Sequence, residues 1–452
     1  MATSVFLFLT YHHSTRVQWV EHSVRPSVGR RIQPERSMGQ DEFPLCGNGQ
    51  AGMPIILKAW IPAFAGTTSI RQTGPEIQIE GFLPEQTDIK FMRRALELAL
   101  QGRGSVSPNP RVGAVIVSPD GKVLGEGYHH KYGESHAEVE AIKACGGADT
   151  NGATIYVTLE PCCHRGKTPP CSQAVIKAGI KRIVIASDDP NPKVNGCGIS
   201  DVRSAGLEVV SGVLEKEARY MNRGYFTLRE KNRAWCSAKI ALSIDGKMAN
   251  LDGESKWITG PEARKYAHTL RADHDAIMVG GSTVWNDNPE LTVRSVEGPD
   301  PVRLVLAPHR GIPVDSKIGT SLNDVPTVLF TSDDATPEGL DLPGLKVHRF
   351  QMDKNGRIDP VDILKTLPQY GILSVMIEGG SYVLSSFMDA GVIDELAIGT
   401  APSVVGTGVS PFDKFDPVTW EKRPRFREGI VRKSGTDFIT TYLREDSSFS
   451  LD

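Results

Sequence analysis

The segment "TLEPCCHRGKTPPC", residues 158–171, places three cysteines in a loop between a predicted strand and a predicted helix. The strand is the apolar run "ATIYVTLE" at 153–160, and the helix is "CSQAVIKAG" at 171–179. A strand that leads through a loop into a helix is typical of an α/β fold. The cysteines form a disulfide staple, a zinc site or a reactive thiol, and the loop alone does not decide among the three.

The composition favours a metal site or a catalytic thiol over a disulfide. Seven cysteines in 452 residues are too few for a disulfide scaffold, and no basic residue precedes the short apolar run near the N-terminus. We therefore expect a cytoplasmic protein with reduced thiols. The net charge of −3 argues against a nucleic-acid partner. No apolar run approaches the roughly 20 residues of a transmembrane helix, so no membrane partner is expected either.

The chain is too long for one ordinary core, and we expect two domains. Residues 1–86 sustain neither a helical nor a strand period. They are predicted to be an unstructured extension or the product of a start codon placed too far upstream, with a small N-terminal domain as the alternative. Residues 87–230 and 233–446 each alternate strands with helices, and the charged stretch 227–235 separates them.

Apolar periodicity predicts the elements of both halves. In the first half we expect helices at 88–102, 136–145, 171–179, 215–226 and up to Gly206, a strand hairpin at 111–129, and strands at 153–160, 181–187 and 208–213. In the second half we expect strands at 235–246, 276–281, 302–308, 327–331, 374–380, 395–402 and 437–445, and helices at 260–274, 360–371 and 381–391.

His136 joins Cys162 and Cys171 as a candidate zinc ligand. A catalytic zinc takes three protein ligands and keeps its fourth position for water, and imidazole and thiolate are suitable donors. Glu138, two residues after His136, is placed to handle the proton of that water. Its alternative role is structural, because "SHAE" at 135–138 is also a helix capping box. The side chain of Cys163 should point away from that of its neighbour, so Cys163 is not assigned as a ligand.

Four motifs resemble the family of bifunctional riboflavin-biosynthesis proteins, in which a pyrimidine deaminase is fused to a pyrimidine reductase. They are "SPNPRVGAVIV" at 107–117, "GYHHKYGESHAE" at 127–138, "TLEPCCHRGKTPPC" and "DDPNPKVNGCG" at 188–198. The resemblance implies a cytidine-deaminase-like three-layer domain followed by a dihydrofolate-reductase-like α/β domain. It implies one zinc per chain on His136, Cys162 and Cys171, Glu138 as the proton shuttle, and Asn109 in the pyrimidine pocket. The family often has Ser where this chain has Cys163.

The second half has glycine turns but no G-x-G-x-x-G fingerprint. "MIEGGSYVLSS" at 376–386 reads as a strand, two glycines and a helix start, where free backbone N–H groups suit a diphosphate. "VGGSTVWNDNP" at 279–289 offers a second glycine turn. In one place the chain departs from the resembled family, because Ala307 and Pro308 stand where an Asp and a small polar residue are usual. Proline removes a backbone donor, so a cofactor contact there is in doubt.

The resemblance also implies site residues for the reductase. NADPH is expected to contact Ala241, Trp257, Thr283, Asp287, Gly380, Ser381, Tyr382, Val383, Leu384, Ser385 and Ser386. The substrate is expected to contact Ser255, Arg271, Leu291, Arg294 and Glu378, and Arg suits its phosphate. Lys239 and Asp287 are expected to assist ring opening or protonation.

The implied activity has two steps. The first is zinc-dependent hydrolytic deamination of 2,5-diamino-6-(5-phosphoribosylamino)pyrimidin-4(3H)-one. The second is NADPH-dependent reduction of the ribosyl side chain to give 5-amino-6-(5-phosphoribitylamino)uracil. The alternative is a nucleotide deaminase with an inactive second domain. The expected partners are the small pyrimidine ribosyl phosphate substrate and further copies of the chain in a homo-oligomer.

Overall fold

The computed structural model describes residues 69–73, 76–80, 86–164, 169–336, 338–354, 356–416 and 419–450. Most of the predicted extension 1–86 lies outside these residues. Within it, β1 (Ser69–Thr73) and β2 (Glu76–Glu80) pair as an antiparallel hairpin. Among the residues that the structure describes, no helix is both long and apolar enough to cross a bilayer.

The first domain is built on a sheet with the strand order β4-β3-β5-β6-β7. Strand β3 pairs antiparallel with β4 and β5, and the pairs β5-β6 and β6-β7 are parallel. The strands are β3 (Gly113–Val117), β4 (Val123–Tyr128), β5 (Thr154–Val157), β6 (Arg182–Ile185) and β7 (Glu208–Ser211). The helices are α1 (Gln86–Ala99), α2 (Ala137–Ala144), α3 (Cys171–Lys177), α4 (Cys197–Ser204), α5 (Glu215–Met221) and α6 (Arg223–Lys231), with a 3-10 turn η1 at Leu100–Gly102.

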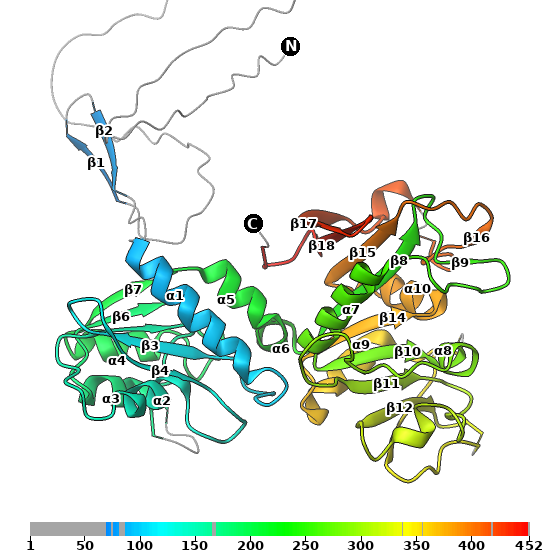
Figure 1. Ribbon diagram of the computed structural model, residues 1–452, viewed down its shortest axis with the longest axis horizontal. Helices are drawn as coiled ribbons and strands as arrows, with labels where there is room; N and C mark the ends of the chain where they lie inside the picture. Colours follow the sequence, from blue (N-terminus) through cyan, green and yellow to red (C-terminus); the bar gives the residue numbers. More distant parts are fainter. Residues whose placement is uncertain are drawn as a thin grey trace, which may run out of the picture. The chain divides into compact units, whose positions relative to one another are not determined.

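Helices cover both faces of this sheet, so the predicted three-layer domain is confirmed. Phe91 and Met92 of α1 pack with Ala218 of α5 on one face. Ala141 of α2 and Val175 of α3 pack with residues of α4 on the other face. Figure 1 shows the helices α2, α3 and α4 together on that side of the sheet. Strand β3 is buried along its whole length, which explains its continuous apolar sequence "GAVIV".

Two glycines in β4 allow α2 to approach the sheet closely. A Cβ at Gly125 would lie 2.3 Å from the carbonyl oxygen of Ala141, and one at Gly127 would lie 2.4 Å from the backbone nitrogen of Ala141. Either contact would force the helix away from the strand. These glycines therefore fix the position of α2, whose N-terminus carries His136 and Glu138.

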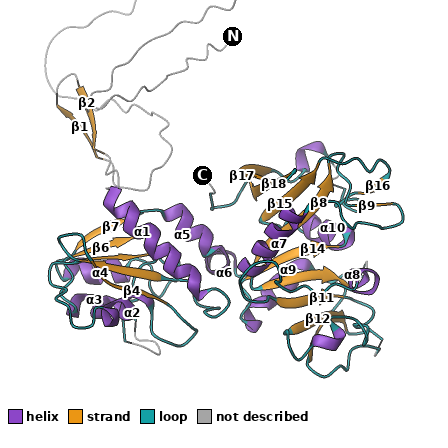
Figure 2. Ribbon diagram, viewed as in Figure 1, coloured by secondary structure: helices purple, strands orange, loops and turns teal. Residues whose placement is uncertain are grey.

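The second domain is built on a sheet with the order β13-β12-β11-β10-β14-β8-β15-β18-β17 (Figure 2). Neighbours from β13 to β15 are parallel, while β15-β18 and β18-β17 are antiparallel. The strands are β8 (Trp235–Ser243), β10 (Ala276–Gly280), β11 (Val302–Leu306), β12 (Thr327–Ser332), β13 (Leu345–Phe350), β14 (Ser374–Gly379), β15 (Glu395–Ala401), β17 (Phe426–Ser434) and β18 (Asp437–Arg444), with a small pair β9 (Ala249–Asn250) and β16 (Gly408–Val409). The helices are α7 (Pro261–Asp273), α8 (Gly281–Asp287), α9 (Pro360–Thr366) and α10 (Ser381–Asp389), with 3-10 turns η2 (Gly319–Ser321), η3 (Leu367–Tyr370) and η4 (Trp420–Lys422).

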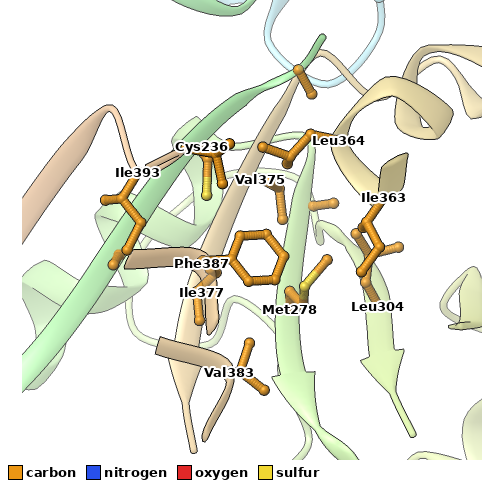
Figure 3. Close-up of a cluster of buried hydrophobic side chains, with 14 of the residues drawn as sticks. Cys236, Met278, Leu304, Ile363, Leu364, Val375, Ile377, Val383, Phe387 and Ile393 are labelled. Carbon is orange, nitrogen blue, oxygen red and sulfur yellow. The ribbon is translucent and has the colours of Figure 1, made fainter. Parts of the chain in front are cut away.

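The core of this domain lies on both faces of the sheet. On one face, Ile363 of α9 and Phe387 of α10 pack against Met278 and Ile377 of the central strands, as Figure 3 shows. On the other face, Val284 of α8 packs against buried residues of β10, β11 and β12. The predicted succession of strands and helices therefore forms an α/β domain, as expected.

The predicted charged helix at 215–226 is two helices. It breaks at Asn222, and α6 continues to Lys231, through much of the stretch that was expected to separate the domains. The Asn222 amide holds the backbone of Arg111, accepting from its N–H at 2.8 Å and donating to its carbonyl oxygen at 2.9 Å. The prediction also missed α8, β13 and β17, which have weak or short apolar patterns.

Several contacts join the first domain to the second, among them an aromatic cluster and a group of ion pairs. Phe226 of α6, Trp235 of β8 and Phe449 near the C-terminus form one buried cluster. The Asp273 carboxylate, at the end of α7, forms ion pairs with Arg111 Nη1 and Arg223 Nη2, each at an N–O distance of 2.9 Å. The Asp273 side chain is 23% exposed, and its partial burial would raise its pKa, but three nearby guanidinium groups keep that pKa far below the usual range.

Candidate active sites

The three predicted zinc ligands come from separate elements and meet at one point. His136 is the N-cap of α2, Cys162 lies in the loop after β5, and Cys171 is the first residue of α3. Their ligand atoms all lie within 4.8 Å of one another. His136 Nδ1 is 3.3 Å from Cys171 Sγ and 3.6 Å from Cys162 Sγ.

The local electrostatics suit a thiolate at Cys162. The thiol of Cys171 hydrogen-bonds to Cys162 and lowers the pKa of Cys162 to about 4, against the effect of burial, and His136 acts in the same direction. The backbone N–H of Cys171 also donates to Cys162 Sγ at 3.4 Å. One imidazole nitrogen and two thiol sulfurs that converge in this way are the donor set of a catalytic zinc site, so the residues present fit the ion.

Glu138 is not part of a capping box, so this alternative is wrong. In the described region the N-cap of α2 is His136, with no side-chain cap, and the Ser135 hydroxyl instead accepts from Lys143 Nζ at 3.1 Å. Glu138 is 3% exposed, and burial raises its pKa to about 7, with a further contribution from Cys162. A carboxyl group with such a pKa can both give and accept a proton near neutral pH.

Glu138, His136 and Cys162 line a cavity of about 250 Å³, while Cys171, the third member of the cluster, is fully buried. Asn109, which the resemblance places in the pyrimidine pocket, lines this cavity, and so does His164 of the cysteine loop. The prediction missed His129, whose Nδ1–H donates to the carbonyl oxygen of Ser135 at 3.0 Å. This bond leaves His129 Nε2 to accept from the Asn109 amide at 3.1 Å, which fixes the amide's orientation. The signal was present in the sequence, because His129 lies in the motif that ends at Glu138.

Cys163 does not join the cluster, as the sequence predicted. It is paired with Cys197 in a disulfide, with the two Cα atoms 5.9 Å apart. The expectation that the thiols are reduced is therefore wrong for this pair. The two residues are 34 positions apart, and only the packing of α4 beside the cysteine loop brings them together.

The reductase residues Arg271, Glu378 and Lys239 lie together on one face of the second sheet. Arg271 of α7 binds the Glu378 carboxylate with two bonds, Nε to Oε1 at 2.5 Å and Nη2 to Oε2 at 2.7 Å. Ile377 of β14 pairs with Ala238 of β8 in parallel, so the next residue on each strand, Glu378 and Lys239, lies beside the other. Burial lowers the pKa of Lys239, and Glu378 partly opposes that effect. Burial would raise the pKa of Glu378, but Arg271 holds it below its usual value.

Two glycine turns lie at the same edge of this sheet, where β10 and β14 end. These strands are parallel neighbours, so the N-termini of α8 and α10 lie side by side. Gly380 has a φ of 79°, which favours glycine, and a Cβ there would lie 3.6 Å from Thr283 Oγ1. Free N–H groups at a helix start, reached over a bare glycine, fit the diphosphate of NADPH. Ala307 faces this edge, because a Cβ at Gly281 would lie 2.7 Å from the Ala307 Cβ.

The remaining predicted reductase residues differ in their exposure. Val383 and Leu384 are buried in the core, so their side chains do not reach a cofactor, and only their backbone is available. Leu291 is also buried. The guanidinium of Arg294 is engaged by the carboxylate of Glu290 and by Thr292 Oγ1. The exposed residues are Trp257, Asp287, Arg294 and Tyr382. The partly buried residues are Ala241, Ser255, Thr283, Ser381 and Ser386. Ser385 is buried, and its hydroxyl accepts a hydrogen bond from the backbone N–H of Lys414.

A three-layer domain with a His–Cys–Cys cluster, followed by a parallel sheet with glycine turns, defines the class of bifunctional zinc deaminases and nicotinamide-dependent reductases. The profile of the cytidine and deoxycytidylate deaminase zinc-binding region matches residues 85–187, and that of the RibD C-terminal domain matches residues 234–440. The chain belongs to the RibD family of riboflavin biosynthesis proteins.

Three relatives show how far this similarity extends. The riboflavin biosynthesis protein RibD of Aquifex aeolicus is 40% identical over 361 residues, which cover 79% of this chain and 99% of the relative. The RibD of Escherichia coli is 36% identical over 368 residues, which cover 77% and 97%. The crystal structure of a diaminohydroxyphosphoribosylaminopyrimidine deaminase/5-amino-6-(5-phosphoribosylamino)uracil reductase from Thermotoga maritima aligns with a TM-score of 0.71 at 36% identity, covering 79% of this chain and 99% of that one.

The predicted class of enzyme is therefore confirmed. The protein is a deaminase and reductase of riboflavin biosynthesis, with Zn²⁺ and NADPH as its cofactors. The alternative of a deaminase with an inactive second domain is not favoured, because the reductase profile matches almost the whole second half.

Proposed function

We propose that this chain deaminates 2,5-diamino-6-(5-phosphoribosylamino)pyrimidin-4(3H)-one and then reduces the product to 5-amino-6-(5-phosphoribitylamino)uracil. The Thermotoga maritima relative is named for this pair of activities. The observation that carries the proposal in this chain is the buried Glu138, which lines one cavity with His136 and Cys162, two members of the cluster that Cys171 completes.

In the first step, the residues of this cavity hold the pyrimidine and move protons. His136, Cys162 and Cys171 would hold one zinc ion, which when bound supplies an activated water. Asn109, oriented by His129, binds the pyrimidine through its amide. Glu138 takes the proton of the attacking water and gives it to the departing amino group, which a carboxyl with a pKa of about 7 can do in both directions.

In the second step, Arg271, Glu378 and Lys239 contact the substrate: Arg271 binds its phosphate, and the Glu378 carboxylate orients Arg271. Arg271 uses three of its five N–H groups on Glu378 and on the carbonyl oxygen of Thr292, so two remain for a phosphate oxygen. Lys239 gives a proton to the ribose ring oxygen as the ring opens. NADPH supplies the hydride that reduces the ribose C1′.

The wider site extends along the edge where β10 and β14 end. The backbone of Gly380 to Ser386 and the side chains of Thr283 and Trp257 would bind NADPH, with Ala241 beside them. Asp287, at the end of α8, contributes to protonation. The substrate's further contacts are proposed to be Ser255, Leu291 and Arg294.

The decisive experiment follows the products of the purified protein by mass. With the diaminopyrimidinone ribosyl phosphate alone, we expect only the deaminated product. With NADPH added, we expect the ribitylamino product and the oxidation of one NADPH for each molecule formed. A protein that deaminates but never consumes NADPH would contradict the second half of the proposal.

The chain's compartment and assembly belong to the same proposal. We infer a cytoplasmic enzyme that acts on a small molecule and forms a homo-oligomer. Light scattering on the purified protein tests the assembly, because a mass near the 49.2 kDa of one chain would exclude it. Residues 1–86 are inferred to be dispensable, with the deaminase at 87–230 and the reductase at 233–446.

A further inference from the structure

The bond between Cys163 and Cys197 links two walls of the deaminase cavity. One wall is the cysteine loop, which presents Cys162 and His164 to the cavity, and Cys163 lies between them in sequence. The other wall is the loop that leads into α4, which presents Asn191 and Val194. The deaminase chemistry described above makes no use of the bond.

The two walls also touch without the bond. The buried Glu160 carboxylate accepts from the backbone N–H groups of Gly196 at 3.0 Å and Ile199 at 3.1 Å. Gly198 lies so close to the cysteine loop that a Cβ there would be 1.8 Å from the carbonyl oxygen of Pro161. These contacts hold the two Cα atoms within the usual span of a disulfide, so the pair can open and close without refolding of the domain.

The pair is also open to reagents. Cys197 is exposed and Cys163 is half-buried. By contrast, Cys145, Cys171 and Cys236 are buried, and Cys162, which is half-buried like Cys163, belongs to the metal-binding cluster. Small thiols and disulfides therefore reach Cys197, the exposed member of the pair, before they reach the buried cysteines.

We propose that Cys163 and Cys197 form a reversible thiol–disulfide site that controls the deaminase cavity. The oxidant is a low-molecular-weight disulfide. The thiolate of exposed Cys197 attacks one of its sulfurs, which forms a mixed disulfide and releases one small thiol. The thiolate of Cys163 then displaces the second small thiol. The two protein thiols are oxidised to the Cys163–Cys197 bond, the small disulfide is reduced to two small thiols, and the two protons of the protein thiols end on those small thiols.

The bond restrains the turn that carries Cys162. In the oxidised protein the turn is tied covalently to α4, and both walls keep the spacing that the pyrimidine and the metal require. In the reduced protein the walls keep their non-covalent contacts, such as those of Glu160 and Pro161, but they lose the covalent tie and so move more freely. We expect reduction to raise the KM of deamination by roughly three- to tenfold, since loss of positioning is costly, and to speed the removal of zinc by a chelator.

The test begins with wild-type protein equilibrated in buffers of increasing oxidised-to-reduced glutathione ratio and then alkylated. Peptide mapping without reductant should show a cross-linked peptide that contains Cys163 and Cys197. Its amount should rise in a single transition as the glutathione ratio increases, and it should disappear on reduction with a phosphine. Deamination KM, reductase rate and zinc release to a chromogenic chelator are measured on the same samples. The KM and zinc release should change with the cross-link, and the reductase rate should stay constant.

Matched serine variants separate the pair from the other cysteines. Cys163→Ser and Cys197→Ser should behave like the reduced wild type in every buffer, and Cys145→Ser should keep the wild-type response. The activity readout rests on the proposed deaminase function, but the cross-link and the zinc release do not, so the two can fail separately. Absence of the cross-linked peptide in every buffer would overturn the proposal. A cross-link that changes neither KM nor zinc release in the wild type would overturn it equally.

Discussion

Glu138 shows how a single enclosed carboxyl group acquires a catalytic pKa. It is the second residue of α2, whose position is fixed by the glycines of β4, and the helix is not capped by Ser135. Burial removes water from the carboxylate and so stabilises its protonated form. The residue can therefore hold and release a proton near neutral pH.

Replacing Glu138 with Gln should abolish deamination and keep the metal. An amide of the same shape cannot move a proton, so kcat/KM should fall by about 100-fold or more. Zinc content, measured by atomic emission, should stay at one ion per chain because His136, Cys162 and Cys171 are unchanged. Reduction of the already deaminated substrate serves as the folding control and should be normal. Deamination at nearly the wild-type rate would contradict the role given to Glu138.

Replacing Arg271 with Ala should cripple reduction. The substitution removes the proposed phosphate contact and also leaves the buried Glu378 carboxylate without its partner. A hydrogen bond to a charged group contributes about 1.5–3 kcal/mol, so reductase kcat/KM should fall at least about tenfold. Arg349→Ala, whose guanidinium binds only backbone carbonyls of Ser332 and Asp333 among the contacts described, is the matched control. Equal losses in both variants would contradict the assignment.

At this scale the sequence predicted which residues belong together only where a motif connects them. His136, Cys162 and Cys171 were assigned from residue type, loop position and resemblance, and the structure brings them together. The Cys163–Cys197 bond could not be predicted, because it depends on how α4 packs beside the cysteine loop. The support of Asn109 by His129 was missed although both residues lie in motifs that the sequence displays, because neither motif shows that the two side chains bind each other.

The turn before α10 requires glycine at position 380, because the backbone there has a φ of 79°. Replacing Gly380 with Ala places a Cβ at a φ of 79°, which costs about 1–2 kcal/mol. The added atom itself meets nothing closer than 3.6 Å, so the effect comes from the backbone. We expect the turn to shift and the KM for NADPH to rise, as measured by initial rates.

Gly206→Ala is the matched control for this prediction. Gly206 follows α4 with a φ of 90°, and a Cβ there would meet nothing within 4 Å. It should lower thermal stability by a similar amount and leave the KM for NADPH unchanged. A rise in that KM in both variants would show that general destabilisation, and not the turn, is responsible.

His274, at the C-terminal end of α7, should make stability depend on pH. Its Nδ1–H donates to the carbonyl oxygen of Leu270 at 2.7 Å, and its Nε2 is 2.9 Å from the Ser237 hydroxyl. Burial and the facing Arg223 lower its pKa to about 4, although Asp273 opposes the shift. The unfolded chain, with an ordinary histidine pKa of about 6.5, therefore binds more protons than the folded one between these two values.

The stability that neutral His274 contributes is complete above pH 6.5 and is lost as the pH falls towards 4. Its slope is at most about 1.4 kcal/mol per pH unit. Urea unfolding at a series of pH values should show this loss, and His274→Gln, which has no charge to gain, should show a flatter slope over the same interval. Identical slopes in the two proteins would contradict the assignment.

Elements were predictable where their apolar pattern was long and regular. The buried strands β3, β10 and β14 and the helices α1 and α7 appear close to their expected bounds. The break between α5 and α6 was not predicted, because it results from Asn222 binding the backbone of Arg111 rather than from a local helix signal. Strands β13 and β17 lie at the two ends of the sheet, where one-sided burial leaves little pattern.

At the scale of the whole molecule, Asp273 of the reductase domain is joined to Arg111 and Arg223 of the deaminase domain. Arg111 follows the segment that carries Asn109, and α7 carries Arg271 two residues before Asp273. Asp273→Asn would leave Arg111 and Arg223 without their carboxylate. Breaking a largely buried ion pair costs about 3 kcal/mol, so the melting temperature should fall by several degrees in calorimetry.

The exposed Asp252→Asn is the control for this substitution and should melt like the wild type. The two activities are also informative. At a temperature where Asp273→Asn is still folded, both should persist, because the carboxylate touches neither site. A selective loss of one activity would show that the contact acts on that site directly.

Strand β8 begins the second sheet in sequence but lies in its interior, between β14 and β15. During synthesis on the ribosome, the first sheet has all its strands once β7 has emerged, whereas β8 must wait for neighbours that are made near the end of the chain. Its apolar, unpaired edges are exposed throughout that interval, when they can pair with other nascent chains. The order of the strands therefore makes the reductase half the part of the chain that most needs molecular chaperones during synthesis. A messenger RNA truncated before the codons for β15 yields a complete deaminase sheet attached to an aggregation-prone remainder.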